Sequence, residues 1–282
     1  MRVLNPAKVR DFFSTDEYTV GFCDVNRTLA PNGALNREMI RSCLVDMWGN
    51  GDKKGAFVLA GRAVDVMVKK WMVGKGKIVY GDQADQVLGL MIQGQKMLEG
   101  KPTKYVDMHT EEILTESLYP GADSLFGLLR IPRNSYAGII SGGTEYTMAS
   151  AVTERFGGDF TIAPRIARVT DRNGVERFGG YFEGNYQKVI SNQWNHDNDW
   201  EGTAIEYMLV NPEEGGKPAE RVIYIDDSKT MLHKRDRIEE ELGVPVLTIG
   251  VNCNKHLAFD VTLENPTEAP ALKQKFAPRR AA

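Results

Sequence analysis

The sequence predicts an α/β protein: a doubly wound parallel sheet with a helical insert and a β-hairpin. Short apolar runs of strand length alternate with segments of helical period, a pattern typical of a parallel sheet covered by helices. Residues 33–118 interrupt this alternation, because their apolar residues recur at helical spacing only. Asn173-Gly174 separates two strand-like runs and supplies the positive φ angles that hairpin turns need.

The composition favours a small-molecule enzyme. The formal net charge of −3, with both signs interspersed, argues against a nucleic-acid partner. The three cysteines lack the spacing of a metal site, and their odd number suits a reducing compartment better than a disulfide framework. No secretory signal and no apolar run of membrane-spanning length is found. We therefore expect a cytoplasmic enzyme without a membrane partner.

The first predicted elements are a short helix and a buried strand. Ala7 to Phe13 predicts the helix, and the apolar run from Thr19 to Cys23 predicts the strand, which ends abruptly at Asp24. The helical insert follows, with helices expected over 36–48, 55–73, 82–99 and 103–118. The methionines of these helices are more typical of a bundle core than of an adaptable binding surface.

The alternation of strands and helices returns after Leu118. The expected elements are helix 122–130, strand 137–140, helix 144–156, strand 160–163, hairpin 166–182, helix 185–193, strand 221–225, helix 229–242 and strand 246–249. Residues 266–282 contain three prolines and several basic residues, which predicts a flexible tail. The predicted domains are therefore a core of residues 1–32 and 119–265 and an insert of residues 33–118.

Three predicted strands end in polar residues, and a parallel sheet brings such ends to one edge. These residues are Asp24, Ser141-Gly142-Gly143 and the pair Asp226-Asp227, and Lys188 lies on a helix predicted between the second and third of these strands. Carboxylates bind magnesium and can attack phosphorus, while lysine and backbone amides neutralise phosphate oxygens. Each residue alone has a plainer interpretation, such as a helix cap or a surface lysine. The joint pattern favours phosphoryl transfer.

The chain resembles the haloacid dehalogenase (HAD) superfamily and, within it, the phosphoserine-phosphatase-like branch. The resemblance covers about Tyr18 to Val261 and rests on four motifs in order. These are Asp24-Val25-Asn26-Arg27-Thr28-Leu29, then Ile139-Ile140-Ser141-Gly142-Gly143 preceded by Tyr119-Pro120-Gly121-Ala122, then Gly184-Asn185-Tyr186-Gln187-Lys188, and finally Ile225-Asp226-Asp227-Ser228. Each motif alone is weak, whereas four in the right order form a strong signal.

The resemblance implies a magnesium-dependent phosphomonoester hydrolase acting on a small phosphorylated metabolite through an aspartyl-phosphate. Asp24 would be the nucleophile, and Thr28 would orient its loop. The implied magnesium ligands are Asp24, the backbone carbonyl of Asn26, Asp226 and Asp227. The implied phosphate-binding residues are Ser141, Gly142, Gly143 and Lys188. The helical insert would be a cap that closes over the substrate and excludes water.

The sequence departs from the family pattern at two places. Asn26 stands where the family's phosphatases carry a second Asp, which acts as the general acid and base, and an amide cannot do this. Asn26 is either a substitution in an ordinary phosphatase or the natural residue. In the second case the chain is a slow phosphatase, a phosphotransferase using another base such as His196, or a phosphate-binding or regulatory protein. Residues 30–35 also lack the acid that meets the ammonium group of phosphoserine in the family, so phosphoserine is not named as substrate.

Overall fold

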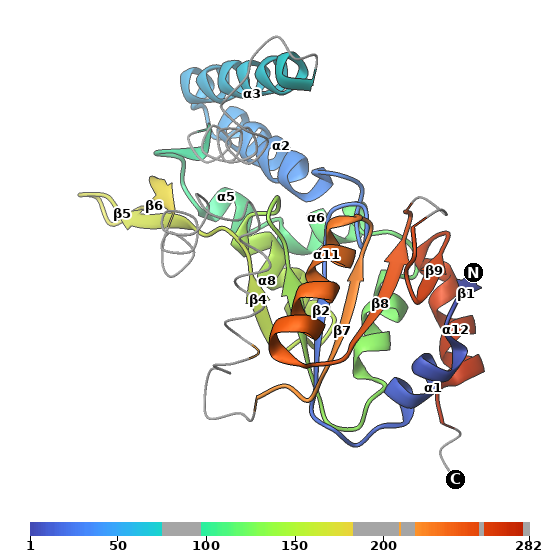
Figure 1. Cartoon of the computed structure of the whole chain (residues 1–282). Coiled ribbons are helices and arrows are strands. Elements are labelled where there is room, and N and C mark those ends of the chain that lie inside the picture. Colours follow the sequence, from blue (N-terminus) through green and yellow to red (C-terminus); the bar gives the residue numbers. More distant parts are fainter. Residues whose placement is uncertain (75–96, 183–208, 210–217, 254–256, 279–282) are drawn as a thin grey trace.

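The computed structural model describes residues 1–74, 97–182, 209, 218–253 and 257–278 and shows a mostly parallel sheet with helices on both faces (Figure 1). Seven strands follow the order β1-β9-β8-β7-β2-β3-β4, and only β1 runs antiparallel to its neighbour. Their bounds are β1 Arg2–Val3, β2 Thr19–Cys23, β3 Ser135–Ile140, β4 Phe160–Ile162, β7 Arg221–Asp226, β8 Val246–Val251 and β9 Val261–Leu263. The predicted α/β class is confirmed.

Strand β2 lies between β3 and β7, and all five of its residues are buried. Cys23 is paired with Ile139 of β3 and with Ile225 of β7. Because the three strands are parallel and in register, their polar C-terminal ends lie at one level along the same edge.

Alternate residues of the central strands enter two separate cores. Phe22 and Tyr224 pack on one face with Met231 of α11, whereas Cys23 and Ile225 belong to the core on the other face. The helices that contribute to the second core include α1 Pro6–Ser14, α7 Ala122–Phe126, α8 Tyr146–Arg155 and α12 Ala269–Phe276, while α11 Thr230–Arg237 covers the first. Both faces of the sheet are therefore covered, as in a doubly wound fold.

The insert is helical in its described part. Helices α2 Ala34–Gly49 and α3 Lys53–Gly74 pack together, and α5 Lys104–Asp107 and α6 Thr110–Ser117 follow. The single helix expected over 103–118 is wrong, because the chain breaks at Met108 and His109, and the His109 side chain bonds Asp46 of α2 and Glu112 of α6. The helix expected over 82–99 falls mostly outside the described residues.

The hairpin of β5 Ile166–Thr170 and β6 Glu176–Phe182 is confirmed, with Gly174 at φ +76° in its turn. It contacts the insert: Arg168 forms an ion pair with Asp107 at 2.8 Å, and Pro102 forms a β-bridge with Arg177. The hairpin therefore joins the insert to the core. The expected helix over 185–193, which contains Lys188, lies outside the described residues.

The flexible tail expected over 266–282 is wrong where the structure describes it. The 3-10 turn η3 Pro266–Glu268 leads into helix α12, whose Leu272 and Phe276 are buried in the core. Asn265 accepts a hydrogen bond from the Thr267 amide and so begins this segment. Pro266 and Pro270 lie in the first turns of η3 and α12, where no helical N–H is lost. No helix in the described ranges is long and apolar enough to span a membrane.

Candidate active site

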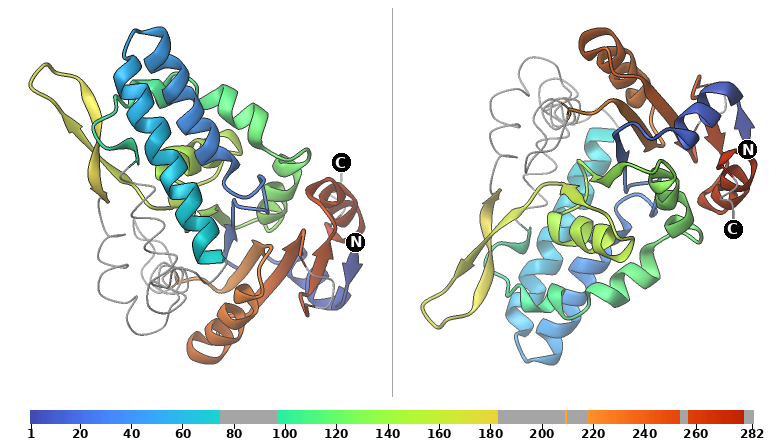
Figure 2. Two further views of the ribbon diagram at one scale, coloured as in Figure 1. Left: turned by 90° about the horizontal axis from the view of Figure 1, so that it is seen from above. Right: turned by 90° about the horizontal axis from the view of Figure 1, so that it is seen from below.

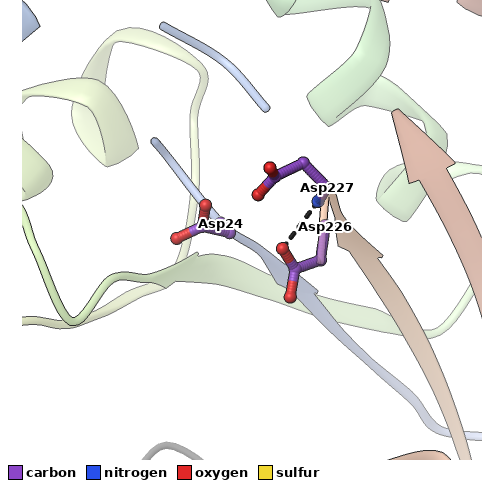
Figure 3. Close-up of side chains that lie close together, drawn as sticks. All are labelled: Asp24, Asp226 and Asp227. Carbon is purple, nitrogen blue, oxygen red and sulfur yellow. Dashed lines mark hydrogen bonds between the residues drawn. The ribbon is translucent and has the colours of Figure 1, made fainter. Parts of the chain in front are cut away.

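Three carboxylates meet where β2 and β7 end. Figure 3 shows the side chains of Asp24, Asp226 and Asp227 close together. One oxygen from each lies within 4.8 Å of the others. The Asp24 amide donates a hydrogen bond to the Ile225 carbonyl at 2.9 Å, which extends the pairing of the two strands to this point. The predicted convergence of these three residues is confirmed.

Local hydrogen bonds fix the orientation of Asp226. Its Oδ1 accepts from the backbone amide of Asp227 at 2.6 Å (Figure 3). The same oxygen accepts from the Ser228 amide at 3.1 Å, and Oδ2 accepts from the Ser228 hydroxyl at 3.1 Å. The residue is buried at the end of a strand. A buried carboxylate needs such donors, and these hold its oxygens in place for a ligand.

The negative charge of Asp227 is less well compensated than that of Asp226. Burial raises the pKa of its carboxyl group, whereas Arg27, at 3.6 Å from Oδ2, acts in the opposite direction. Two further carboxylates lie beside it, and like charges at this separation repel. A bound cation would relieve this repulsion.

The donor set fits magnesium. Mg²⁺ prefers oxygen ligands at about 2.0–2.1 Å in octahedral geometry, which places opposite ligands about 4.2 Å apart. The three carboxylate oxygens, all within 4.8 Å of one another, need only small movements to meet this spacing. The Cys23 side chain belongs to the apolar core beside the sheet, and burial raises the pKa of its thiol well above the usual value.

The loop after Asp24 turns sharply over residues 25–30. Arg27 has φ +64°, its amide donates to the Ala30 carbonyl at 2.6 Å, and its own carbonyl accepts from Asn252 Nδ2 at 2.7 Å. Val25 and Thr28 point into the protein and are fully buried. Among the described residues nothing bonds the Thr28 hydroxyl, so its expected orienting role stays a prediction.

Asn26 connects this loop to the end of β3. Its Nδ2 donates to the Ser141 hydroxyl at 3.4 Å and to the Thr144 hydroxyl at 3.2 Å, while its Oδ1 accepts from the Gly33 amide at 2.9 Å. Donor and acceptor of the amide are thus both used. The structure brings Ser141 and Asn26 together and ties both to the start of the insert.

The loop Ser141-Gly142-Gly143-Thr144 follows β3 and precedes α8. The Ser141 hydroxyl accepts a hydrogen bond from the Thr144 amide at 3.2 Å, as in a short turn. A Cβ on Gly143 would lie 2.8 Å from Asn26 Nδ2, so any other residue would displace that side chain. This close packing explains why residue 143 is a glycine. Phosphate binding by Ser141, Gly142 and Gly143 stays a prediction.

Asn36 forms a contact that the sequence did not indicate. It lies in the first turn of α2, and its side chain donates to the Gly143 carbonyl at 2.7 Å and accepts from the Glu145 amide at 3.2 Å. The NH₂ group of an asparagine can donate to a backbone carbonyl while its side-chain oxygen accepts from a backbone amide. The sequence pattern indicates only that a helix begins at this residue. Arg27 and Thr144 were also missed, and Lys188 lies outside the described residues.

Comparisons with known proteins support the fold. No protein-family model matches the chain, and no curated protein matches it. A Bordetella pertussis Tohama I protein of unknown function is similar in structure, with a TM-score of 0.51 and 15% identity, over 86% of this chain and 93% of that one. At this identity the likeness shows a shared fold and nothing about activity.

Two further similar structures belong to proteins whose names give an enzyme class. YfnB from Bacillus subtilis, a candidate HAD-hydrolase bound to magnesium, has a TM-score of 0.40 and 13% identity over 91% of this chain and 98% of that one. A β-phosphoglucomutase from Clostridium difficile has a TM-score of 0.39 and 15% identity over 93% of this chain and 97% of that one. Scores below 0.5 are too low to support a conclusion about this chain.

Proposed function

We propose that the chain is a magnesium-dependent phosphomonoester hydrolase of the HAD superfamily, in its phosphoserine-phosphatase-like branch, acting on a small phosphorylated metabolite. The meeting of Asp24 with Asp226 and Asp227 at one sheet edge carries this proposal. Nearby, the Ser141-Gly142-Gly143 turn is hydrogen-bonded to Asn26. Carboxylates for a cation and a hydroxyl with a glycine turn for an oxyanion thus lie on neighbouring strands.

In this mechanism a carboxylate oxygen of Asp24 attacks phosphorus and the ester P–O bond breaks, which leaves an aspartyl-phosphate and an alkoxide that takes a proton from solvent water. A second water then attacks phosphorus, loses a proton to the hydroxide formed in the first step, and the Asp24–phosphate bond breaks, releasing inorganic phosphate. The Ser141 hydroxyl and the amides of Gly142 and Gly143 would hold the phosphoryl oxygens. Lys188 would balance their charge, and residues 33–118 would act as the cap.

Asp226 and Asp227, with Asp24 and the Asn26 carbonyl, would hold the ion. Magnesium supplies positive charge that neutralises phosphate oxygens and lowers the repulsion between them and the Asp24 carboxylate. Ser228 and the amide of Asp227 keep Asp226 oriented toward the cluster.

The test is hydrolysis of a panel of phosphomonoesters with and without magnesium. Asp24→Asn should abolish release of phosphate, because an amide is not a nucleophile, and EDTA should do the same until magnesium is restored. Asp123→Asn removes an exposed carboxylate on α7 and should leave the rate unchanged. Hydrolysis by Asp24→Asn, or full activity in EDTA, would refute the mechanism.

Asn26 favours a second candidate: a protein that binds a phosphorylated ligand and turns it over slowly or not at all. The amide offers no proton to the leaving group, and its hydrogen bonds to Ser141, Thr144 and Gly33 are all satisfied. A rise in melting temperature with magnesium plus phosphate, without hydrolysis of any ester in the panel, would support this candidate over the first.

A further inference from the structure

Helix α3 exposes many large apolar side chains. Six of the twelve exposed large hydrophobic residues in the described part of the chain lie on this one helix. The exposed fractions are 68% for Phe57, 54% for Val64, 60% for Met67 and 55% for Trp71. Single exposed apolar residues are normal, but a contiguous set on one element marks an interaction surface.

Five of these six exposed residues, together with Ala60 and Gly61, form one stripe. The stripe consists of Phe57, Ala60, Gly61, Val64, Met67, Val68 and Trp71. Successive members are one or three positions apart, and Phe57, Gly61, Val64, Val68 and Trp71 follow one another at steps of three or four, so the members lie along one side of the helix. None of the seven is charged or polar. The stripe therefore has the pattern of a helix that packs against another helix.

The stripe is not the side by which α3 joins its own fold. Ala56, Leu59, Ala63 and Val66 pack against the core formed with α2. In Figures 1 and 2, α3 lies at the outside of the molecule, beyond α2 and away from the sheet. In the described part of the chain, α3 thus has two apolar sides: α2 packs against one, and the residues of the other are largely exposed.

The stripe is self-complementary about Val64. Phe57 and Trp71 lie seven residues to either side of it, Ala60 and Val68 lie four, and Gly61 and Met67 lie three. In an antiparallel pair with a two-fold axis at Val64, residues equally distant from the axis come to the same level. Each small residue would then lie beside a larger one, and Phe57 beside the partner's Trp71.

The exposed area is sufficient for a stable contact. Trp48 of α2 extends the surface, because its ring lies 5.6 Å from that of Phe57. Six half-exposed side chains (Trp48, Phe57, Val64, Met67, Val68 and Trp71) provide on the order of 600 Å² per copy, taking about 150–250 Å² for a whole aromatic side chain. This reaches the lower bound of about 1,200 Å² in total for a specific interface.

We propose that this stripe is the interface of a homodimer in which the α3 helices of two copies pack antiparallel about a two-fold axis at Val64. Such an interface is isologous, since the same patch is used by both copies. It is independent of the phosphatase activity proposed above.

The full chain should behave in light scattering after gel filtration as a particle of twice 31.5 kDa. Val64→Glu places two carboxylates together at the axis and should give monomers. The dissociation constant of the dimer should rise at least tenfold above that of the native protein. Val58→Glu is the matched control: it is the same substitution on the same helix, at a residue 44% exposed that lies about 120° around the helix from Val64. It should remain dimeric.

Cross-linking tests the axis directly and does not depend on the Glu variants folding. Val64→Cys should form a disulfide-linked dimer on mild oxidation, because a residue at the axis meets its own copy. Val58→Cys should not, and it also measures the background from the native cysteines. A native protein that stays monomeric at its highest soluble concentration overturns the proposal, as does a dimer that survives Val64→Glu or cross-links equally through Val58→Cys.

Discussion

Strand β2 and helix α3 are both rich in apolar residues, but their surroundings differ. All five residues of β2 are buried, and its partners β3 and β7 come from its own chain. Helix α3 buries one side against α2 and exposes the stripe around Val64. The core thus buries the apolar residues of β2 between its own strands and leaves polar residues where these strands end, whereas α3 exposes apolar residues on the surface of the described insert.

The largest expected effect concerns the polar edge of the core. Asn26→Asp should raise phosphate release by about 10²–10⁴-fold if the site lacks only its proton donor, because this is the usual contribution of a general acid and base. Initial rates on the most active ester of the panel measure it. The double change Asp24→Asn with Asn26→Asp should stay inactive. No gain in rate would favour the binding protein instead.

A matched pair of truncations compares the two regions directly. Phe22 is fully buried and its ring lies 5.5 Å from that of Phe160, so Phe22→Ala should lower the free energy of unfolding by about 3–5 kcal/mol. Phe57 is 68% exposed, so Phe57→Ala should cost under about 1 kcal/mol in dilute protein. Urea unfolding followed by circular dichroism measures both. Equal losses would show that the stripe is buried within one chain.

Magnesium should stabilise the core through the carboxylate cluster. At a concentration 100-fold above its dissociation constant, a ligand that binds only the folded state adds about 2.7 kcal/mol. Thermal unfolding at rising magnesium concentration should therefore shift upward, and Asp227→Asn should weaken the response by removing one ligand. Asp123→Asn is the control. An unchanged response in the Asp227 variant would exclude that residue from the metal site.

The smallest effect is expected where the insert helices meet. The carboxylates of Glu112 and Asp46 accept hydrogen bonds from the His109 ring and raise the pKa of His109. A raised pKa means that the folded state binds the proton more tightly, so the stabilisation is complete below the usual pKa of about 6.5 and is lost as the pH rises through the raised value. Such exposed pairs contribute at most about 1 kcal/mol. Melting temperatures of the native protein and His109→Gln should converge as the pH rises; a gap that widens would contradict this.

Much of the core could be predicted from local patterns. The apolar runs around β2, β3 and β7 are short and end in polar residues, and the Asn173-Gly174 turn fixes the hairpin. Strands β1 and β9 could not be predicted, because each is very short and Arg2 pairs with Thr262, far away in the chain. Helix α12 could not be predicted because Pro266 and Pro270 suggested an irregular segment, although proline is harmless at a helix start.

The sequence by itself determined the kinds of groups in the site and the alternation that brings Asp24, Asp226 and Asp227 to one edge, because parallel strands align their ends whatever lies between them. Only the tertiary structure decided that Asn26 bonds Ser141 and Thr144, that Asn36 of α2 holds the Gly143 backbone, and that one side of α3 stays exposed. These depend on distances between residues remote in sequence, and a helical period shows that a face is apolar without showing what covers it.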